Sequence, residues 1–357
     1  MRGYGAYRGR SRGRTFLKIL ILVLVALLIA TVVAFFRLEP YIIYTSDGIR
    51  LDLPGHGEDT APPSAPAVDP PVIIVTPEPT PTPEPEVFMA LQLPRSALVE
   101  GTAEEQLREA GANAAVFDMK ADDGSLGYVS DLELARTTGA SSAEPGLNEA
   151  IRQLTGGDVY TVARVSCFRD NTVPYNDNST ALRTAIGNWR DRENIRWLSP
   201  ARESACEYVA GICRELAALG FDEILLDYPA FPTESDGSLD NLTVGEAYPA
   251  EALETAVEEF YSAVRAALAG YPATMLSIVS SEAVLSGDPA DQSGQTVSQL
   301  AEYADRVWAP EPVQSTSNYA GALEAAGMED AGIRLVLMTD ALPVGEAGFW
   351  AVMDLNN

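Results

Sequence analysis

Short apolar runs alternate with amphipathic stretches from Val87 to Asn357. Eight runs are rich in aliphatic and aromatic residues and bounded by turn residues, as buried strands are. They cover residues 87–93, 114–120, 159–168, 223–228, 274–280, 306–310, 334–339 and 349–354. Six stretches with helical spacing of apolar residues lie at about 103–110, 145–155, 201–219, 248–269, 296–304 and 317–326. This alternation is typical of parallel βα units.

The length and the alternation together predict an α/β fold, a (β/α)8 TIM barrel, over residues 87–357. An open doubly wound sheet is the competing architecture. It is less favoured because no glycine-rich phosphate loop follows any predicted strand. No helix follows the last predicted strand, so we expect an upstream segment or an open side at that edge.

A separate apolar segment lies near the N-terminus. Residues 19–36 contain no charge, and a helix of this length spans ~27 Å, close to the hydrocarbon thickness of a bilayer. Residues 1–18 carry six basic residues and no acid. Because positive charge stays in the cytoplasm, we expect a basic cytoplasmic tail (1–18), an uncleaved transmembrane signal-anchor (19–36) and a barrel outside the cell membrane. A cleaved signal peptide is the alternative, but its apolar core would be shorter.

Two segments connect the predicted anchor to the predicted barrel. Residues 37–53 include YIIYTSDGIRLDL, which is typical of a short hairpin with Asp47 and Gly48 at its turn. Residues 54–86 are rich in proline and end in the run TPEPTPTPEPE. Such a linker is an extended, semi-rigid spacer.

Charge and residue usage exclude several classes of function. The formal net charge is −27, of which the first forty residues contribute +6 and the remainder −33. A surface this acidic repels nucleic acid. The single histidine, His56, lies in the linker, which excludes histidine-based triads and most zinc sites from the barrel, and no metal or cofactor is expected. The three cysteines are predicted to be small buried hydrophobes rather than disulfide partners.

Charged and aromatic residues gather where the predicted strands end, which is the functional face of a barrel. They are Asp118, Lys120, Asp122 and Asp123 after the second strand; Arg164, Arg169 and Asp170 at the third; Trp189, Arg190, Asp191, Arg192 and Trp197 in the loop that follows; Asp227 and Tyr228 at the fourth; and Glu282, Glu311 and Asp340 after the next three. Paired carboxylates cleave glycosidic bonds, and aromatic rings and arginines bind sugars. The pattern therefore favours carbohydrate chemistry.

Four blocks carry a resemblance to a known family. AAVFDMKADDGSLGY (114–128), VYTVARVSCFRD (159–170), NWRDRENIRWLSP (188–200) and LGFDEILLDYPAFP (219–232) resemble the glycoside hydrolase-like domains of bacterial surface proteins. Those domains are similar to alpha-amylase-type TIM barrels. The resemblance implies that Asp227 falls at the nucleophile position, and that Asp118, Lys120 and Arg164 match the family's strand-two acid and lysine and its strand-three arginine.

The chain also departs from the family pattern. Ala230 stands where the family usually has arginine, and SIVSSEAV replaces a segment that usually carries an aspartate. We therefore expect Glu282 or Glu311 to supply the second catalytic carboxylate beside Asp227. Trp189, Arg190, Asp191 and Tyr228 are expected to bind substrate together with the strand-two and strand-three residues.

The expected function is that of a membrane-anchored glycoside hydrolase acting on envelope or environmental polysaccharide. The alternative is a non-catalytic glycan-binding or scaffold protein. Two expectations concern charged groups at the mouth of the barrel. Arg164 is expected to keep Asp227 ionised. Lys120 is expected to lie within salt-bridge distance of Asp118 or Asp227, since residues two apart in a strand share a face; pairing with Asp122 or Asp123 alone is its alternative.

Overall fold

The computed structural model describes residues 42–45, 48–51, 87–288, 291–312, 318–341 and 348–353. The predicted tail (1–18), transmembrane helix (19–36) and proline-rich linker (54–86) lie outside these residues. Within the part described, no helix is both long enough and apolar enough to cross a membrane. The chain divides into two units, Met1–Pro79 and Thr80–Asn357, and each is described by itself.

The first unit contains an antiparallel pair of strands. β1 (Ile42–Thr45) pairs with β2 (Gly48–Leu51), with Thr45 opposite Gly48. This is the position at which the sequence predicts a hairpin.

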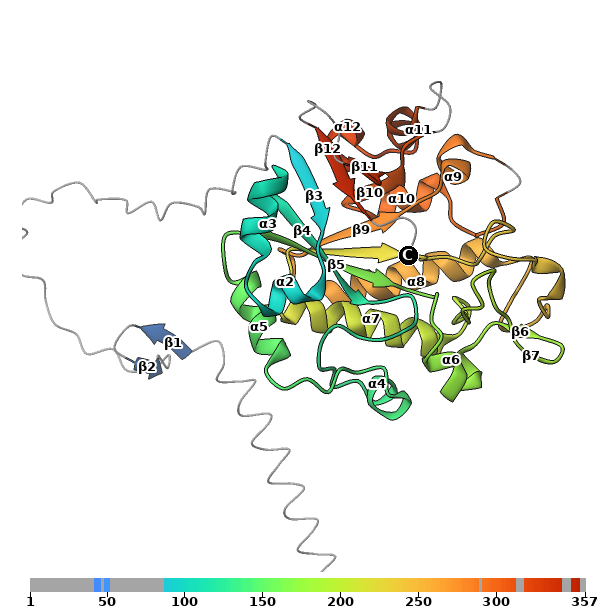
Figure 1. Cartoon of the computed structure of the whole chain (residues 1–357), viewed down its shortest axis with the longest axis horizontal. Helices are drawn as coiled ribbons and strands as arrows, with labels where there is room; N and C mark the ends of the chain where they lie inside the picture. Colours follow the sequence, from blue (N-terminus) through green and yellow to red (C-terminus); the bar gives the residue numbers. More distant parts are fainter. Residues whose placement is uncertain are drawn as a thin grey trace, which may run out of the picture. The chain divides into compact units, whose positions relative to one another are not determined.

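The second unit is a closed barrel of eight parallel strands (Figure 1). In barrel order they are β3 (Phe88–Gln92), β4 (Ala114–Lys120), β5 (Tyr160–Ser166), β8 (Glu223–Asp227), β9 (Met275–Val279), β10 (Arg306–Pro310), β11 (Leu335–Thr339) and β12 (Phe349–Val352). Each lies within a predicted strand, and the TIM-barrel prediction is confirmed. The last strand needs no separate cover, because β12 pairs in parallel with β3 and closes the sheet.

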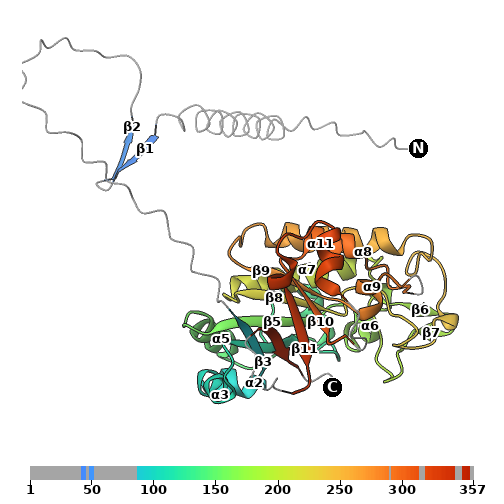
Figure 2. The same ribbon diagram turned by 90° about the horizontal axis from the view of Figure 1, so that it is seen from above.

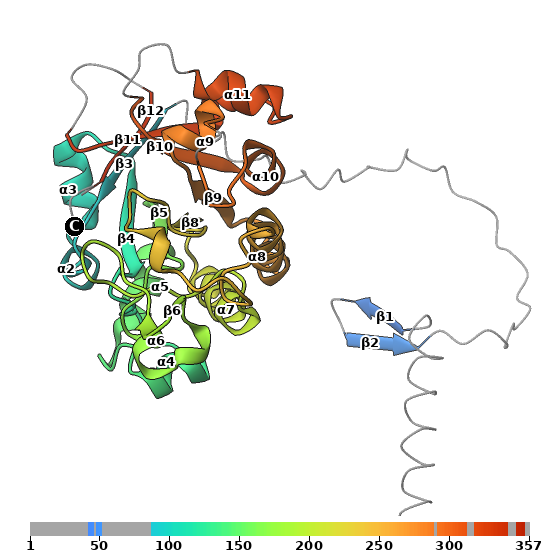
Figure 3. The same ribbon diagram turned by 90° about the vertical axis from the view of Figure 1, so that its right-hand side faces the viewer.

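Helices surround the strands (Figure 3). The six predicted from the sequence are α3 (Ala103–Ala110), α5 (Leu147–Thr155), α7 (Glu203–Ala218), α8 (Leu253–Leu268), α10 (Val297–Tyr303) and α11 (Tyr319–Ala325). Shorter elements were not predicted: α2 (Arg95–Val99), α4 (Glu133–Thr138), α6 (Val173–Asn176), α9 (Glu282–Ser286), α12 (Ala331–Arg334), the 3-10 turns η2 (Asn178–Thr180) and η3 (Leu239–Asn241), and the hairpin β6 (Arg183–Thr184) and β7 (Gly187–Asn188). They are too short to show a periodic pattern.

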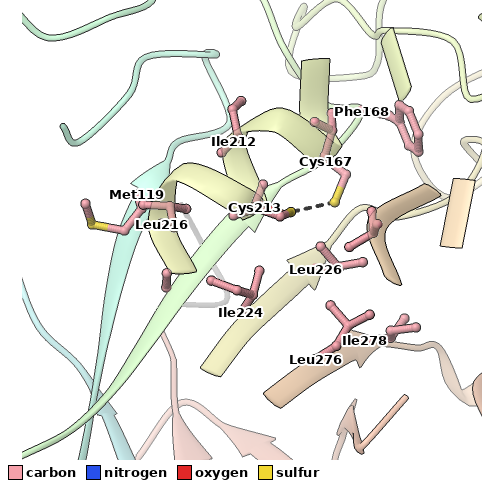
Figure 4. Close-up of a cluster of buried hydrophobic side chains, with 14 of the residues drawn as sticks. Met119, Cys167, Phe168, Ile212, Cys213, Leu216, Ile224, Leu226, Leu276 and Ile278 are labelled. Atoms are coloured by element: carbon pink, nitrogen blue, oxygen red, sulfur yellow. Dashed lines mark hydrogen bonds between the residues drawn. The ribbon is translucent and has the colours of Figure 1, made fainter. Parts of the chain in front are cut away.

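One apolar cluster fills the inside of the barrel and a larger one packs between strands and helices. The alternation of side chains along each strand explains the division, since Ala114 and Val116 of β4 face inward while Ala115 and Phe117 pack outward. Figure 4 shows part of the outer cluster, where the sulfurs of Cys167 and Cys213 point toward each other. All three cysteines are free and two are fully buried, as predicted.

An ion pair lies inside the barrel, at the N-terminal ends of its strands. Glu223 is fully buried and its carboxylate is 2.6 Å from Nη1 of Arg306. It also accepts hydrogen bonds from Tyr160, Ser277 and Trp308. Because every partner is a donor, the buried charge is satisfied, and this end of the barrel is closed by packing.

The opposite end carries the long loops. Figures 1 and 2 place α6 and the β6–β7 hairpin together, at the end toward which the strand arrows point. Asn188 ties the two together by donating to the Pro174 carbonyl at 2.6 Å. This end holds the candidate site.

Candidate functional site

Arg164 is the centre of a cluster of carboxylates at the C-terminal ends of three neighbouring strands. Its Nη1 lies 2.9 Å from Asp118 on β4, and its Nη2 lies 2.6 Å from Asp227 on β8. The same Nη2 lies 2.9 Å from Asp122, in the loop after β4. The structure thus brings together Asp118, Arg164 and Asp227, as the sequence suggested, and adds Asp122. Asp118 is the most accessible of the acids, with 38% of its side chain exposed.

The two acids bound to the same nitrogen have opposite electrostatic environments. Burial acts to raise the pKa of Asp122, but Arg164 and Arg169 outweigh it, and the pKa lies below its ordinary value. Burial raises the pKa of Asp227, and there Arg164 only partly opposes the effect. Arg164 lowers the pKa of Asp227, as expected of an opposite charge, but the loss of water around this carboxylate has the larger effect and the net direction is upward.

A second arginine extends the cluster into the following loop. Arg169 contacts Asp122 through Nη1 at 2.5 Å and Asp191 through Nε at 2.8 Å, and it also pairs with Glu193. Asp122 therefore bridges two arginines. Sequence reasoning noted Asp122 and Arg169 at strand ends but assigned them no role. Their position directly after two adjacent strands was the available signal.

Lys120 differs from its prediction. It is fully buried, its Nζ lies 3.0 Å from Asp170, and it donates to the carbonyls of Ser166 and Arg169. The cause is an irregularity in β4: Asp118 pairs with Arg164 but Lys120 pairs with Val165, so one extra residue intervenes. Such a bulge re-aims the side chains after it. Lys120 is thus an internal ion-pair partner rather than a substrate-binding residue.

Asp170 and Gly124 hold the loop after β4 against the third strand. The Asp170 carboxylate accepts the backbone N–H groups of Thr172 and Val173 at 2.9 and 2.8 Å. Gly124 has a φ of +87°, and a Cβ there would lie 2.1 Å from the Asp170 carboxylate. Only glycine meets both requirements, and the neighbouring Asp122 is positioned by this close contact.

The loop at 188–200 is built on buried tryptophans. Trp189 and Trp197 are each 2% exposed, so the expectation that Trp189 stacks on substrate is wrong in this structure. Trp189 donates to the Ser238 carbonyl, and Trp197 donates to Asp191. Asp191 also accepts from the backbone of Ile195, and it organises the loop from inside rather than facing a ligand. Burial of loop aromatics depends on tertiary contacts that a sequence pattern does not carry.

Tyr228 follows Asp227 in a left-handed conformation, with a φ of +46°. Such a conformation is an outlier for a bulky residue and is characteristic of functional sites. Its N–H donates to the Asp227 carboxylate at 2.9 Å. Its ring packs edge-on against Trp197 and lies 5.3 Å from the guanidinium of Arg169. Half-buried Tyr228 lines a pocket beside the cluster, and its role in substrate binding stays a prediction.

A small pocket of roughly 140 Å³ lies beside this cluster. Arg169, Asp191, Glu193 and Tyr228 form one part of its wall, and Arg192, Ser235 and Asp236 form the rest. The pocket connects the strand ends to the loop, and its lining is almost entirely polar.

Glu282 and Glu311 follow the next two strands around the barrel. Glu282 is the first residue of α9. The pKa of Tyr319 on α11 is raised by the burial of its own hydroxyl and by the negative charge of Glu282. Glu311 follows β10 and is exposed. Their role as a second catalytic carboxylate stays a prediction. Asp122 also lies close to Asp227: since one carboxylate oxygen of each contacts the same Nη2, the two oxygens are at most about 5.5 Å apart.

Across the described ranges, no group of three or more histidine, cysteine, aspartate or glutamate residues could hold an ion. Among the three carboxylates of the mouth, the guanidinium of Arg164 takes the central position.

A parallel barrel with carboxylates and arginines at the C-terminal ends of its strands has the architecture of a barrel enzyme. The family described as "Putative glycosyl hydrolase domain" matches residues 96–320, and the chain belongs to this family.

Solved structures are similar to this chain to different extents. The glycoside hydrolase domain of PgaB (BpsB) from Bordetella bronchiseptica is 16% identical, over 76% of this chain and 94% of that chain, with a TM-score of 0.50. A hypothetical protein from Ruminiclostridium thermocellum is 25% identical over 53% of this chain and 96% of that one, with a TM-score of 0.44. A GH18 chitinase from Cycas revoluta is 15% identical over 70% and 68%, with a TM-score of 0.40. No curated protein matches the chain.

The contact between Gly124 and Asp170 can be tested by a pair of alanine substitutions. Gly124 and Gly139 both have positive φ, but a Cβ at Gly139 meets nothing within 4 Å. Gly139→Ala should therefore cost only the conformational strain, about 1–2 kcal/mol. Gly124→Ala should cost at least about 2 kcal/mol more, because it displaces a buried ion-paired carboxylate. Urea unfolding measures both, and equal losses would show that the contact is unimportant.

Asp122 should stabilise the fold in a pH-dependent way. A carboxylate whose pKa is lowered by folding contributes stability above its unfolded pKa of about 4, and this contribution is lost as pH falls through the folded pKa. The difference in unfolding free energy between wild type and Asp122→Asn should therefore be largest above pH ~5 and shrink toward pH ~3. Exposed Asp123, whose side chain caps a turn at Ser125, gives the control Asp123→Asn. A difference independent of pH would contradict the ion pairing of Asp122.

Proposed function

We propose that this chain is a glycoside hydrolase displayed outside the cell by an N-terminal membrane helix, where it cleaves envelope or environmental polysaccharide. The observation that carries the hydrolase proposal is the group of three carboxylates around Arg164 at the mouth of the barrel. Membership of a glycosyl hydrolase family supports it. Anchoring is supported by the uncharged segment 19–36 and the basic residues before it.

The environments of Asp227 and Asp122 suggest which roles they would take in the reaction. Glycosidases combine a carboxyl group that carries a proton with a carboxylate that stays ionised, and the two are distinguished by their surroundings. Asp227 accepts hydrogen bonds from Arg164 and from the N–H of Tyr228, which suits an ionised nucleophile or base, and Glu282 or Glu311 would carry the proton. Arg164 and Arg169 hold the pKa of Asp122 low, which suits a negative charge that stabilises the oxocarbenium-like transition state.

The remaining residues of the mouth would position the substrate. Asp118 is exposed and fixed on one side by Arg164 and on the other by the amide of Gln92, so its orientation toward a sugar hydroxyl is preset. Tyr228 offers a half-buried ring beside Asp227. Glu282 and Glu311 are the two candidates for the second catalytic carboxylate.

Asp227→Asn should abolish turnover and spare binding. The full-length chain is first screened for hydrolysis of cell-wall and plant polysaccharides. Loss of this catalytic carboxylate should then lower the rate by about 10²–10⁴-fold with little change in glycan affinity. Asp123→Asn, a change of the same chemistry on the exposed turn, should be active. Full activity in Asp227→Asn would remove this residue from the catalytic pair.

The same screen separates the hydrolase from the second candidate, a glycan-binding or scaffold protein. One observation favours that candidate: the carboxylates of the mouth already accept hydrogen bonds from Arg164 and Arg169. Binding of a polysaccharide without turnover of any would support it.

Membrane topology gives an independent prediction. An epitope tag after residue 357 should be digested by protease added to intact cells, whereas the same tag before residue 1 should be protected. Both forms should sediment with membranes. Protection of the C-terminal tag, or its release in a soluble form, would contradict the anchor.

A further inference from the structure

Arginines gather on the loop beside the candidate site, although the chain as a whole is acidic. The loop from Arg183 to Arg196 carries Arg183, Arg190, Arg192 and Arg196. Within the described residues, none of these four has a carboxylate within salt-bridge distance, whereas Arg164 and Arg169 have three each. The acids of the loop face the other way, since Asp191 and Glu193 both pair with Arg169. The two acids of the loop therefore pair with Arg169, and its four arginines are left without an ion-pair partner among the described residues.

Two of these arginines lie side by side. Arg190 and Arg196 are partners in an antiparallel backbone bridge that flanks the turn at 191–194. Burial and the nearby charge of Arg190 both lower the pKa of Arg196, as expected of neighbouring like charges. Each guanidinium has one identified acceptor, the Asn194 carbonyl for Arg190 and the Asn171 side chain for Arg196. Since a guanidinium has five N–H groups, most donors of the pair remain for another partner.

An exposed aromatic ring completes this surface. Tyr175, on α6, is 65% exposed, and the guanidinium of Arg196 lies 4.7 Å from its ring centroid. A planar guanidinium held against an aromatic ring keeps its N–H edge free for a carboxylate or phosphate. The ring itself offers an apolar face of the kind that packs against sugars.

We infer that Arg190, Arg196 and Tyr175 form a binding site for the anionic group of a charged saccharide. Neighbouring guanidiniums bind carboxylate or phosphate through paired hydrogen bonds. Asp191, next to Arg190 in the chain, pairs with Arg169, which also pairs with Asp122, so the proposed site borders the catalytic candidates. As a statement about substrate, the inference rests on the proposed function, and it names the substrate class as an acidic polysaccharide. The rest of the surface is acidic and repels such a polymer. Salt screens charge over about 8 Å at physiological ionic strength, so this repulsion is weak at the arginine site itself.

Binding is the measurement that tests this site, because it is independent of turnover. The full-length chain is compared, by affinity electrophoresis, on polygalacturonate, on a glycerol-phosphate polymer and on neutral xylan. We expect retardation by at least one anionic polymer, weakening with salt, and little by xylan. Retardation by polygalacturonate alone would identify the anion as a carboxylate, and by the phosphate polymer alone as a phosphate. Binding of xylan as tight as that of both anionic polymers, or no binding of either, overturns the inference.

Substitutions then locate the site. Arg190→Gln and Arg196→Gln should each weaken binding of the anionic polymer by on the order of tenfold, the effect of one charge-assisted hydrogen bond. Arg190→Lys should fall between wild type and Arg190→Gln, since it keeps the charge and loses the planar fork. Arg214→Gln changes an exposed arginine on α7 that has no ion pair within the described residues, and it should bind like wild type. Thermal unfolding confirms that each variant is folded, and unchanged binding in both arginine variants overturns the inference.

Failure here and failure of the proposed hydrolase give different results. If Asp227→Asn binds the anionic polymer as wild type does, but no polysaccharide is ever cleaved, the binding site stands and the hydrolase proposal fails. If a neutral polysaccharide is cleaved at the same rate by wild type and by the arginine variants, the hydrolase stands and the acidic substrate class is wrong.

Discussion

The guanidinium of Arg164 is the group on which the mouth of this barrel depends. It is only 10% exposed, and a cation so buried is tolerated because three carboxylates surround it. Those carboxylates come from two strands and a loop, so satisfying one charge fixes the relative position of β4, β5, β8 and the turn after β4. Removing Arg164 would leave three carboxylates close together in a partly dehydrated place without the cation that neutralises them. The geometry of the candidate site thus follows from the need to neutralise one buried arginine.

The charges continue outward in alternation. Asp118, Arg164, Asp122, Arg169 and Asp191 follow one another in contact, from strand β4 to the loop beyond the mouth. In a partly buried network, each pair polarises the next, and the energy belongs to the network rather than to any pair. Lys120 and Asp170 lie beneath it as a separate, fully buried pair that supports the same loop. Trp189 and Trp197 are buried in the loop at 188–200 and do not face the mouth of the barrel.

Much of the fold was predictable because long parallel strands and helices repeat a pattern. The strands at 114–120 and 306–310 and the helix at 103–110 begin and end where the sequence placed them. The convergence of Asp118, Arg164 and Asp227 was predictable as well, since strand ends meet at one face of a barrel. Lys120 was not, because a one-residue bulge has no periodic signature. Burial of Trp189 and the raised pKa of Asp227 depend on how water is excluded by distant segments, which local sequence does not encode.

The parallel pairing of β12 with β3 has a consequence for how the chain folds during its synthesis. The first and last strands of the barrel are neighbours, so a nascent chain exposes an unpaired edge of β3 throughout the synthesis of everything between them. Contacts between such distant segments form slowly, and the open intermediate is prone to aggregate. Pairing of this edge of β3 therefore waits until β12 has been synthesised. A premature stop that removes only β12 leaves most of the helices intact and yet yields a sheet with two open edges.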